Sequence, residues 1–265
     1  MCEICPQGDT ARLAQKLRER LQEMTAVSQT LRASLAGDEK AENYLAILDR
    51  AICVQLRLVR QLELGQQLYT KSEVRLIPDL VDLVELGRNV MQKTDDLTRP
   101  LLEIRAEFSS PLATLPARAD RTALEEMLLF FLSNSVRAIG RDGTIRLELE
   151  RQRDQAVFTV TDTGGGLDPD TLADLFDPLA EAETRSSGLR LARRIAELHG
   201  GTMVAGSTET GGARLAVSIP IVERTVGVVR SPAIPVDNSG GWDLALVALS
   251  DFLPLAAFLP DRGEK

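Results

Sequence analysis

Residues 162–166 combine a carboxylate with closely spaced glycines at the end of an apolar segment, residues 157–161, which is expected to be a strand. Glycines carry no side chain, so the backbone there can approach a flat ligand closely. The carboxylate of Asp162 can accept a hydrogen bond from an amino group on such a ligand. Asp-Thr-Gly-Gly is also ordinary turn chemistry, so a neighbouring phosphate or metal site is needed to distinguish the two interpretations.

A second candidate lies on an expected helix over residues 121–139, for which Asp120 is a suitable N-cap. Asn134 ends an apolar run on this helix, and its amide oxygen is a hard ligand of the kind that magnesium prefers. Arg137 follows one turn later on the same face, within reach of a phosphate. The alternative is an ordinary surface pair, because the sequence lacks the common phosphate-binding loops Gly-x-x-x-x-Gly-Lys-Ser/Thr and Gly-x-Gly-x-x-Gly.

Composition limits the class of protein. The 265 residues are 44% hydrophobic and 26% charged, which is typical of a globular protein with a substantial core. The formal net charge of −8 argues against nucleic acid as a main partner. We expect a cytosolic protein without a membrane span: three cysteines do not make a disulfide framework, the N-terminus does not resemble a signal peptide, and no apolar run reaches about 18 residues.

Two helical segments are expected before the chemical motifs, at residues 10–35 and 41–64. Their apolar stripes are too wide for two helices to shield, so we expect an antiparallel hairpin that forms a four-helix bundle in a homodimer. The alternative is a hairpin packed against its own chain. Cys2 and Cys5 form a Cys-x-x-Cys pair, which we interpret as two terminal thiols rather than a zinc site shared in a dimer.

The later segments predict an α+β sandwich, with helices covering one face of a mixed sheet. Three domains are expected: the hairpin at 1–66, the sandwich at 67–223 and a C-terminal extension at 224–265. Within the extension, residues 242–253 are expected to form a short amphipathic helix that docks on its own protein, with binding of a partner as the alternative. The other expected elements are helices at 79–97, 172–176 and 189–199 and strands at 102–108, 112–116, 144–149, 156–161, 203–207 and 213–219.

The sandwich segment resembles the GHKL ATPases, in particular the ATP-binding domain of sensor histidine kinases. Four motifs carry the resemblance in order and spacing over residues 71–222: an N box ending in Leu-Ser-Asn-Ser-Val-Arg (132–137), a first glycine box (162–167), a reduced F box (175–177) and a second glycine box with its helix (187–201).

The resemblance implies a Bergerat-type sandwich that binds ATP or ADP together with Mg2+. By it, Asp162 holds the adenine amino group, Asn134 ligates the magnesium ion and Arg137 contacts a phosphate. The remaining nucleotide contacts fall in the two glycine boxes, at Gly164, Gly166, Gly188, Leu189 and Arg190.

Several positions depart from the family pattern. Gln15 stands where the hairpin of a histidine kinase carries its phosphoaccepting histidine, and His199, the one histidine of the chain, belongs to a helix end. Phe130 replaces a polar residue that helps to orient metal or water one turn before Asn134. The second glycine box has lost two glycines, and the lid between Phe176 and Gly188 is short; Arg185 or Arg190 is expected to compensate at the phosphates, or Arg190 to occupy the site.

These departures favour a nucleotide-binding pseudokinase that regulates two-component signalling and cannot phosphorylate itself on histidine. Its expected partner is a response regulator or a kinase. One alternative is an active GHKL kinase that phosphorylates a partner in trans, as the serine kinases of anti-sigma factors do. Another is a docking module without nucleotide, related to bundle-type phosphotransferases.

Overall fold

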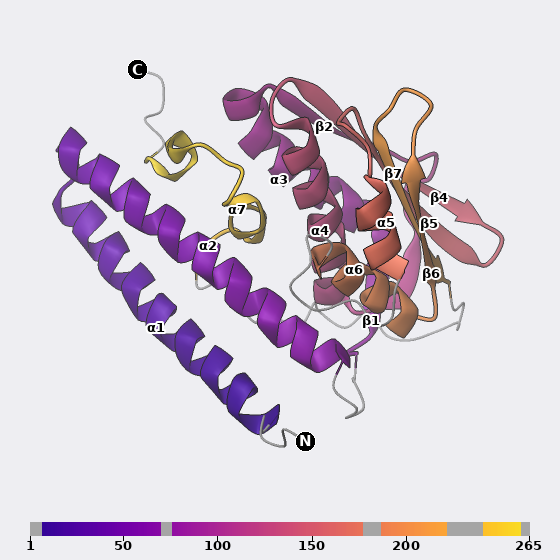
Figure 1. The fold of residues 1–265 in the computed structure, drawn as a ribbon, viewed down its shortest axis with the longest axis horizontal. Helices are drawn as coiled ribbons and strands as arrows, with labels where there is room; N and C mark the ends of the chain where they lie inside the picture. Colours follow the sequence, from indigo (N-terminus) through magenta and orange to yellow (C-terminus); the bar gives the residue numbers. More distant parts are fainter. Residues whose placement is uncertain (1–6, 70–75, 177–186, 222–240, 261–265) are drawn as a thin grey trace. The chain divides into compact units, whose positions relative to one another are not determined.

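The structure is a computed structural model that describes residues 7–69, 76–176, 187–221 and 241–260 (Figure 1). The chain divides into two compact units. One unit joins residues 1–70 to residues 236–265, and the other comprises residues 71–235. Each unit is described on its own below.

The first unit is built on an antiparallel hairpin of α1 (Gln7–Ser34) and α2 (Glu39–Tyr69). Side chains buried between and around the two helices include Ala14 and Leu21 of α1 and Ile52 and Leu56 of α2. The expected end of the second helix near Leu64 is wrong, because α2 continues through Gly65 to Tyr69. A glycine inside a helix costs only about 1 kcal/mol, which the packing of neighbouring residues can offset.

The C-terminal segment folds onto the same hairpin. It forms α7 (Leu244–Leu249), begun by the side chain of Asp243, and the 3-10 helix η1 (Leu255–Phe258), and both pack against α2. The expectation that this segment docks on its own protein is therefore confirmed. The expected single helix over 242–253 is shorter than predicted, because the chain turns after Leu249 and Pro254 begins the second short helix.

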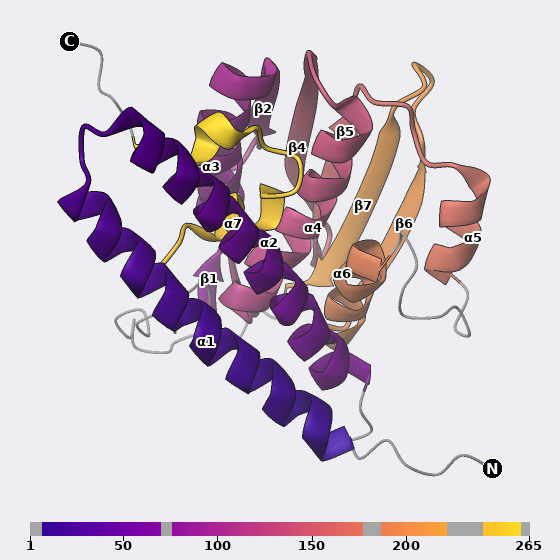
Figure 2. The ribbon, with the colours of Figure 1, turned by 60° about the vertical axis from the view of Figure 1, so that its left-hand side comes forward.

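The second unit is a five-stranded mixed sheet with its helices on one face (Figures 1 and 2). The strand order is β2-β4-β5-β7-β6; β2 and β4 are parallel, and the other pairs are antiparallel. This arrangement confirms the expected α+β class. The strands are β2 (Ile104–Ser109), β4 (Gly143–Gln152), β5 (Gln155–Asp162), β6 (Thr202–Ser207) and β7 (Ala213–Pro220), and the helices are α3 (Leu83–Leu102), α4 (Arg121–Ile139), α5 (Pro169–Phe176) and α6 (Ser187–Leu198).

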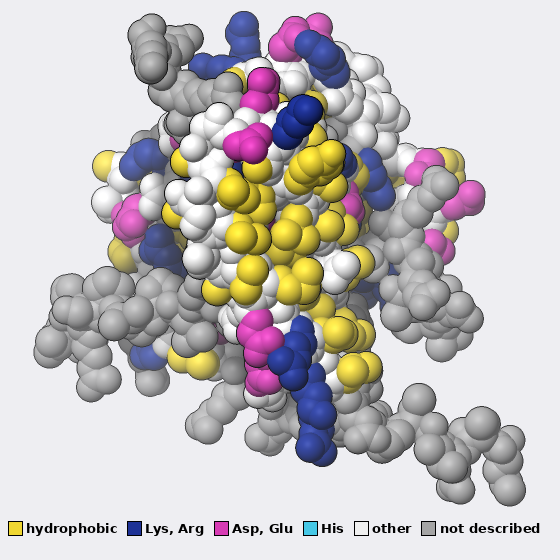
Figure 3. Space-filling view, turned by 90° about the vertical axis from the view of Figure 1, so that its left-hand side faces the viewer, with side chains coloured by type: hydrophobic (Ala, Val, Ile, Leu, Met, Phe, Trp, Pro, Cys, Tyr) yellow, Lys and Arg dark blue, Asp and Glu magenta, His cyan; other side chains and the backbone are white. Residues whose placement is uncertain are grey.

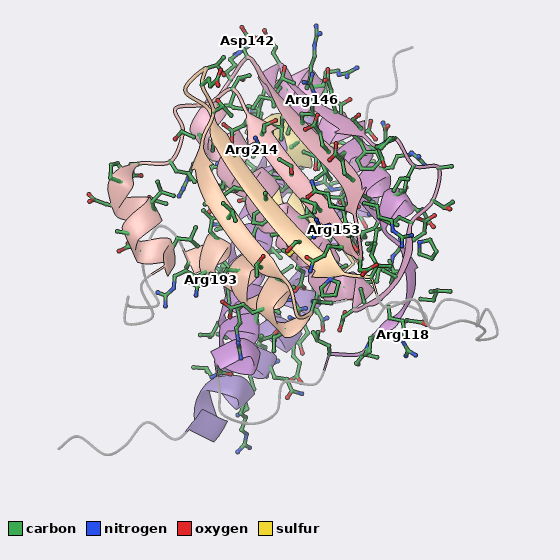
Figure 4. All side chains as sticks on the ribbon, turned by 90° about the vertical axis from the view of Figure 1, so that its right-hand side faces the viewer. Arg118, Asp142, Arg146, Arg153, Arg193 and Arg214 are labelled. Carbon is green, nitrogen blue, oxygen red and sulfur yellow. The ribbon has the colours of Figure 1, made fainter. Side chains whose placement is uncertain are left out.

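The two faces of this sheet differ as the alternation of side chains requires. Leu147, Phe158 and Val217 are buried beneath the helices. Arg146 and Arg214 lie on the opposite face, which none of the described helices of this unit covers (Figure 4). None of the described helices is long and apolar enough to cross a membrane.

Two expected elements are corrected near the start of this unit. The helix expected over 79–97 begins only at Leu83, because Asp79–Asp82 is a strand, β1, that pairs with β3 (Pro116–Ala119). The strand expected over 112–116 is likewise displaced, since β3 starts where it was expected to end. Asp82 determines the boundary between β1 and α3. Its carboxylate accepts hydrogen bonds from the backbone N–H groups of Val84, at the start of α3, and of Leu115.

Candidate nucleotide site

Asp162 lies at the end of β5 and is 5% exposed. Its Oδ1 accepts hydrogen bonds from the backbone N–H groups of Gly164 at 3.0 Å and Ala213 at 3.1 Å, and its Oδ2 accepts one from the Ser135 hydroxyl at 2.7 Å. A carboxylate offers about four lone-pair positions, so three donors leave one for a ligand. The donors fix the orientation of this acceptor before any ligand arrives.

Glycines let three segments converge on this carboxylate. A Cβ at Gly212 would stand 1.7 Å from the carbonyl oxygen of Asp162, and one at Gly164 would stand 2.8 Å from the Cβ of Ala138 on α4. Gly166 has φ of 77°, a conformation that side chains rarely adopt, and its added Cβ would meet the carbonyl oxygen of Gly211 at 2.7 Å. The first glycine box is thus held between α4 and the β6–β7 turn.

Helix α4 positions the second group of side chains. The Asp120 carboxylate accepts from the N–H of Ala123 and caps the helix as predicted. Asn134 is 8% exposed, and its Oδ1 accepts a hydrogen bond from Nη2 of Arg137 at 2.7 Å. The oxygen that the sequence resemblance assigns to magnesium therefore faces a guanidinium group.

Helix α6 approaches α4 at the second glycine box. A Cβ at Gly188 would stand 3.2 Å from the Phe130 ring, so the missing side chain at this position makes room for Phe130. Leu189 is buried and Arg190 is half-buried on the same helix. The Phe130 ring lies one turn before Asn134 and close to the start of α6, where the resemblance predicts the phosphates. Arg185 lies outside the described residues.

His199 and Gln15, which the resemblance places at the phosphoacceptor position, both make contacts within the helical elements. Nε2 of His199 accepts from the N–H of Asp120 at 3.1 Å, and Nδ1 lies 2.8 Å from the carbonyl oxygen of Ile195, to which it donates. His199 thus connects the end of α6 to the start of α4, the helix-terminal role expected from the sequence. Gln15 lies exposed on α1, where its amide donates to Glu19 at 3.2 Å.

The structure brings together Asp162, Gly164, Gly166 and the Asn134–Arg137 pair, and places Gly188 against Phe130 on the same helix α4. Sequence reasoning gave no role to Ser135, Gly212 or Ala213, which surround Asp162. Ser135 follows Asn134 directly, and a second polar side chain after the apolar run of this helix was the available signal. The Ala213 donor and the closely approaching Gly212 lie about 50 residues from Asp162 in the sequence, and only the β5–β7 pairing brings them close.

The site thus consists of a glycine-lined carboxylate at the end of a strand, beneath a helix that carries Asn and Arg, in an α/β sandwich. Residues 119–223 match the family of histidine kinase-, DNA gyrase B- and HSP90-like ATPases. This segment is therefore a GHKL domain of the histidine-kinase type, and the expected resemblance is confirmed.

The relatives with curated descriptions are sensor kinases. The chain is 32% identical over 165 residues to the sensor histidine kinase ZraS of Salmonella typhimurium, covering 57% of this chain and 36% of that protein. It is 32% identical over 142 residues to the circadian input-output histidine kinase CikA of Synechococcus elongatus, covering 51% of this chain and 19% of that protein. The chain thus spans about a third or less of the length of these two relatives.

Solved structures show the same fold. Full-length ShkA in complex with AMPPNP superposes with a TM-score of 0.63 at 25% identity, covering 84% of this chain and 47% of that chain. Histidine kinase ThkA in complex with the response regulator protein TrrA superposes with a TM-score of 0.53 at 23% identity, covering 81% of this chain and 61% of that chain.

Proposed function

We propose that this chain is a nucleotide-binding regulator of two-component signalling that does not phosphorylate itself on histidine. The observation that carries the proposal is the buried Asp162 carboxylate, which three donors hold with one acceptor position left for an adenine amino group. The glycines around it leave the backbone free to approach a flat base. The AMPPNP complex of ShkA supports ATP or ADP as the ligand.

The phosphates are assigned to the side of the site where Arg137, Gly188, Leu189 and Arg190 lie. Arg137 presents a permanent positive charge beside α4, and a planar guanidinium suits phosphate oxygens. Helix α6 begins at Ser187, so its first N–H groups and its dipole favour an anion at this end.

The pseudokinase part of the proposal rests on the phosphoacceptor. Gln15 has no nitrogen that can be phosphorylated as a histidine is, and both ring nitrogens of His199 are used in structural contacts. We therefore propose regulation through binding, with the hairpin as a homodimerisation element. Because the relatives are sensor kinases, a response regulator or another kinase is the proposed partner class.

Isothermal titration with ATP tests the nucleotide part. The wild type is expected to bind, and Asp162→Asn, which exchanges an acceptor for a donor beside the adenine, is expected to lose roughly tenfold or more in affinity. Arg146→Gln on the uncovered face of the sheet is the matched control and is expected to bind as the wild type does (Figure 4). Absence of binding at millimolar nucleotide would leave a docking module instead.

Incubation with γ-labelled ATP tests the pseudokinase part. The chain is expected to remain unlabelled, alone and with a response regulator. Reproducible transfer of label to a partner protein would instead establish the kinase that acts in trans, and label on the chain itself would refute the proposal.

A further inference from the structure

The donor set around Asn134 does not fit a magnesium ion. Magnesium requires near-octahedral oxygen coordination at about 2.0–2.1 Å and is usually held by one or two carboxylates plus phosphates and water. Here the oxygen at the predicted position is a neutral amide that already accepts from Nη2 of Arg137 at 2.7 Å. Among the described residues, no group of three or more His, Cys, Asp or Glu side chains is arranged to hold a metal.

Electrostatics add to this mismatch. A divalent ion ligated by Oδ1 of Asn134 would lie within about 5 Å of the Arg137 guanidinium, since both would bind the same oxygen. Two positive charges so close repel each other; the buried side of the pair at Asn134 lacks water that could screen them, whereas water reaches the exposed Arg137. One helical turn earlier the side chain is the Phe130 ring, which supplies no oxygen and packs over Gly188.

We infer that Arg137 takes the place of the metal, so that this chain binds its nucleotide without Mg2+. Asn134 acts as a positioning residue: its amide oxygen uses one of the five N–H donors of the guanidinium and holds the group beside α4. The remaining donors can form the paired, charge-assisted hydrogen bonds that suit phosphate oxygens. This inference rests on the proposed nucleotide binding and names the group that balances the negative charge of the phosphates.

Titration of the full chain with ATP, once in excess Mg2+ and once in EDTA, tests the inference. We expect the two dissociation constants to agree within about threefold, because the protein itself supplies the positive charge. Arg137→Gln is expected to weaken binding in EDTA roughly tenfold or more, since it removes charged hydrogen bonds to phosphate. It is expected to leave adenosine binding unchanged, because Asp162 contacts only the base.

Two further variants separate the positioning role of Asn134 from the positive charge of Arg137. Arg137→Lys keeps the positive charge and is expected to retain part of the metal-free affinity. Asn134→Asp adds a carboxylate that can ligate a metal, so it is expected to weaken binding in EDTA and to make binding respond to Mg2+. Arg146→Gln, which changes an exposed arginine on the uncovered face of the sheet, is the matched control and is expected to leave both titrations unchanged.

The outcomes distinguish failure of metal-free binding, failure of the role of Arg137 and failure of the proposed function. Binding in Mg2+ but not in EDTA would refute metal-free binding and leave the proposed function intact. Equal binding in both buffers with an unaffected Arg137→Gln variant would refute the role of Arg137. Absence of ATP binding in both buffers would remove the proposed function, and the inference with it.

Discussion

The interior of the hairpin strongly changes the pKa of one titratable group, the thiol of Cys53. Its side chain is fully buried in α2, one turn after Asp49, whose carboxylate accepts hydrogen bonds from Ser28 and Arg32 of α1. Burial, and secondarily the negative charge of Asp49, raise the pKa of the Cys53 thiol from 9.0 to about 12. The folded protein therefore holds a proton that the unfolded chain releases at a lower pH.

This difference predicts an alkaline loss of stability. Above about pH 9 the unfolded thiol ionises while the folded thiol does not, so the free energy of unfolding falls as pH rises from 9 towards 12. Cys53→Ala should make this fall shallower. Denaturation of both proteins between pH 8 and pH 11, followed by helical circular dichroism, measures the difference, and identical slopes would contradict it. Cys2→Ser removes a thiol outside the described residues and serves as the control for the loss of a thiol.

At the scale of elements, the C-terminal segment acts as a cap on the hairpin. Arg57 of α2 forms an ion pair with Asp251 and lies 5.7 Å from the centre of the Phe252 ring. Arg32 of α1 donates to the carbonyl oxygen of Phe258, and the Trp242 indole donates to the Thr25 hydroxyl at 3.2 Å. Because the cap contacts both helices, we expect it to stabilise the hairpin.

Truncation of a buried side chain in the cap tests this role. Leu249 has none of its side chain exposed, so Leu249→Ala is expected to destabilise the first unit by about 2–5 kcal/mol. Leu259→Ala, at a position that is 37% exposed in the same segment, should cost much less. Urea denaturation of the full chain gives both values. If the Leu249 variant unfolds at the same urea concentration as the wild type, the cap does not stabilise the hairpin.

Elements whose signals are local were predicted well from the sequence. Helix α4 has the bounds expected from its N-cap at Asp120 and the turn after Ile139, and the β4–β5 hairpin follows its alternating pattern. The pairing of β1 with β3 was missed, because residues 79–82 meet 116–119 only through a non-local contact. The site follows the same rule: Asp162 and Asn134 were found from local motifs, whereas the Phe130–Gly188 contact required the packing of α4 against α6.

At the scale of the whole molecule, the hairpin presents an uncovered apolar surface. The apolar side chains of α1 divide in the structure: Ala14 and Leu21 turn inward, whereas others such as Leu17 remain exposed. Figure 3 shows hydrophobic side chains gathered on the surface of the hairpin. The large exposed ones are Leu13, Leu17, Met24, Val27 and Leu31 on α1, Leu35 directly after its end, and Tyr44, Ile47, Leu58 and Leu62 on α2.

These residues recur at intervals of three, four, seven and eleven, which keep them on one side of each helix, as in helices that pack against partner helices in a bundle. Exposed apolar stripes on both helices favour a second hairpin as the partner, because a two-fold axis would bury all of them at once. We therefore predict that the chain is a homodimer with a mass of about twice 28.9 kDa by light scattering. Leu17→Glu combined with Leu58→Glu should yield a monomer that retains its helical content, since both side chains are exposed in the single chain.

Val204→Glu is the matched control, because Val204 is 66% exposed on β6 in the other unit and its change should leave the dimer intact. A wild type that elutes as a monomer at every concentration would refute the bundle. A dimer that survives the Leu17 and Leu58 changes would place the interface on another surface. Loss of the dimer in the hairpin variant alone would establish that the exposed stripes join two copies of the chain, so that each hairpin completes its core only in the assembly.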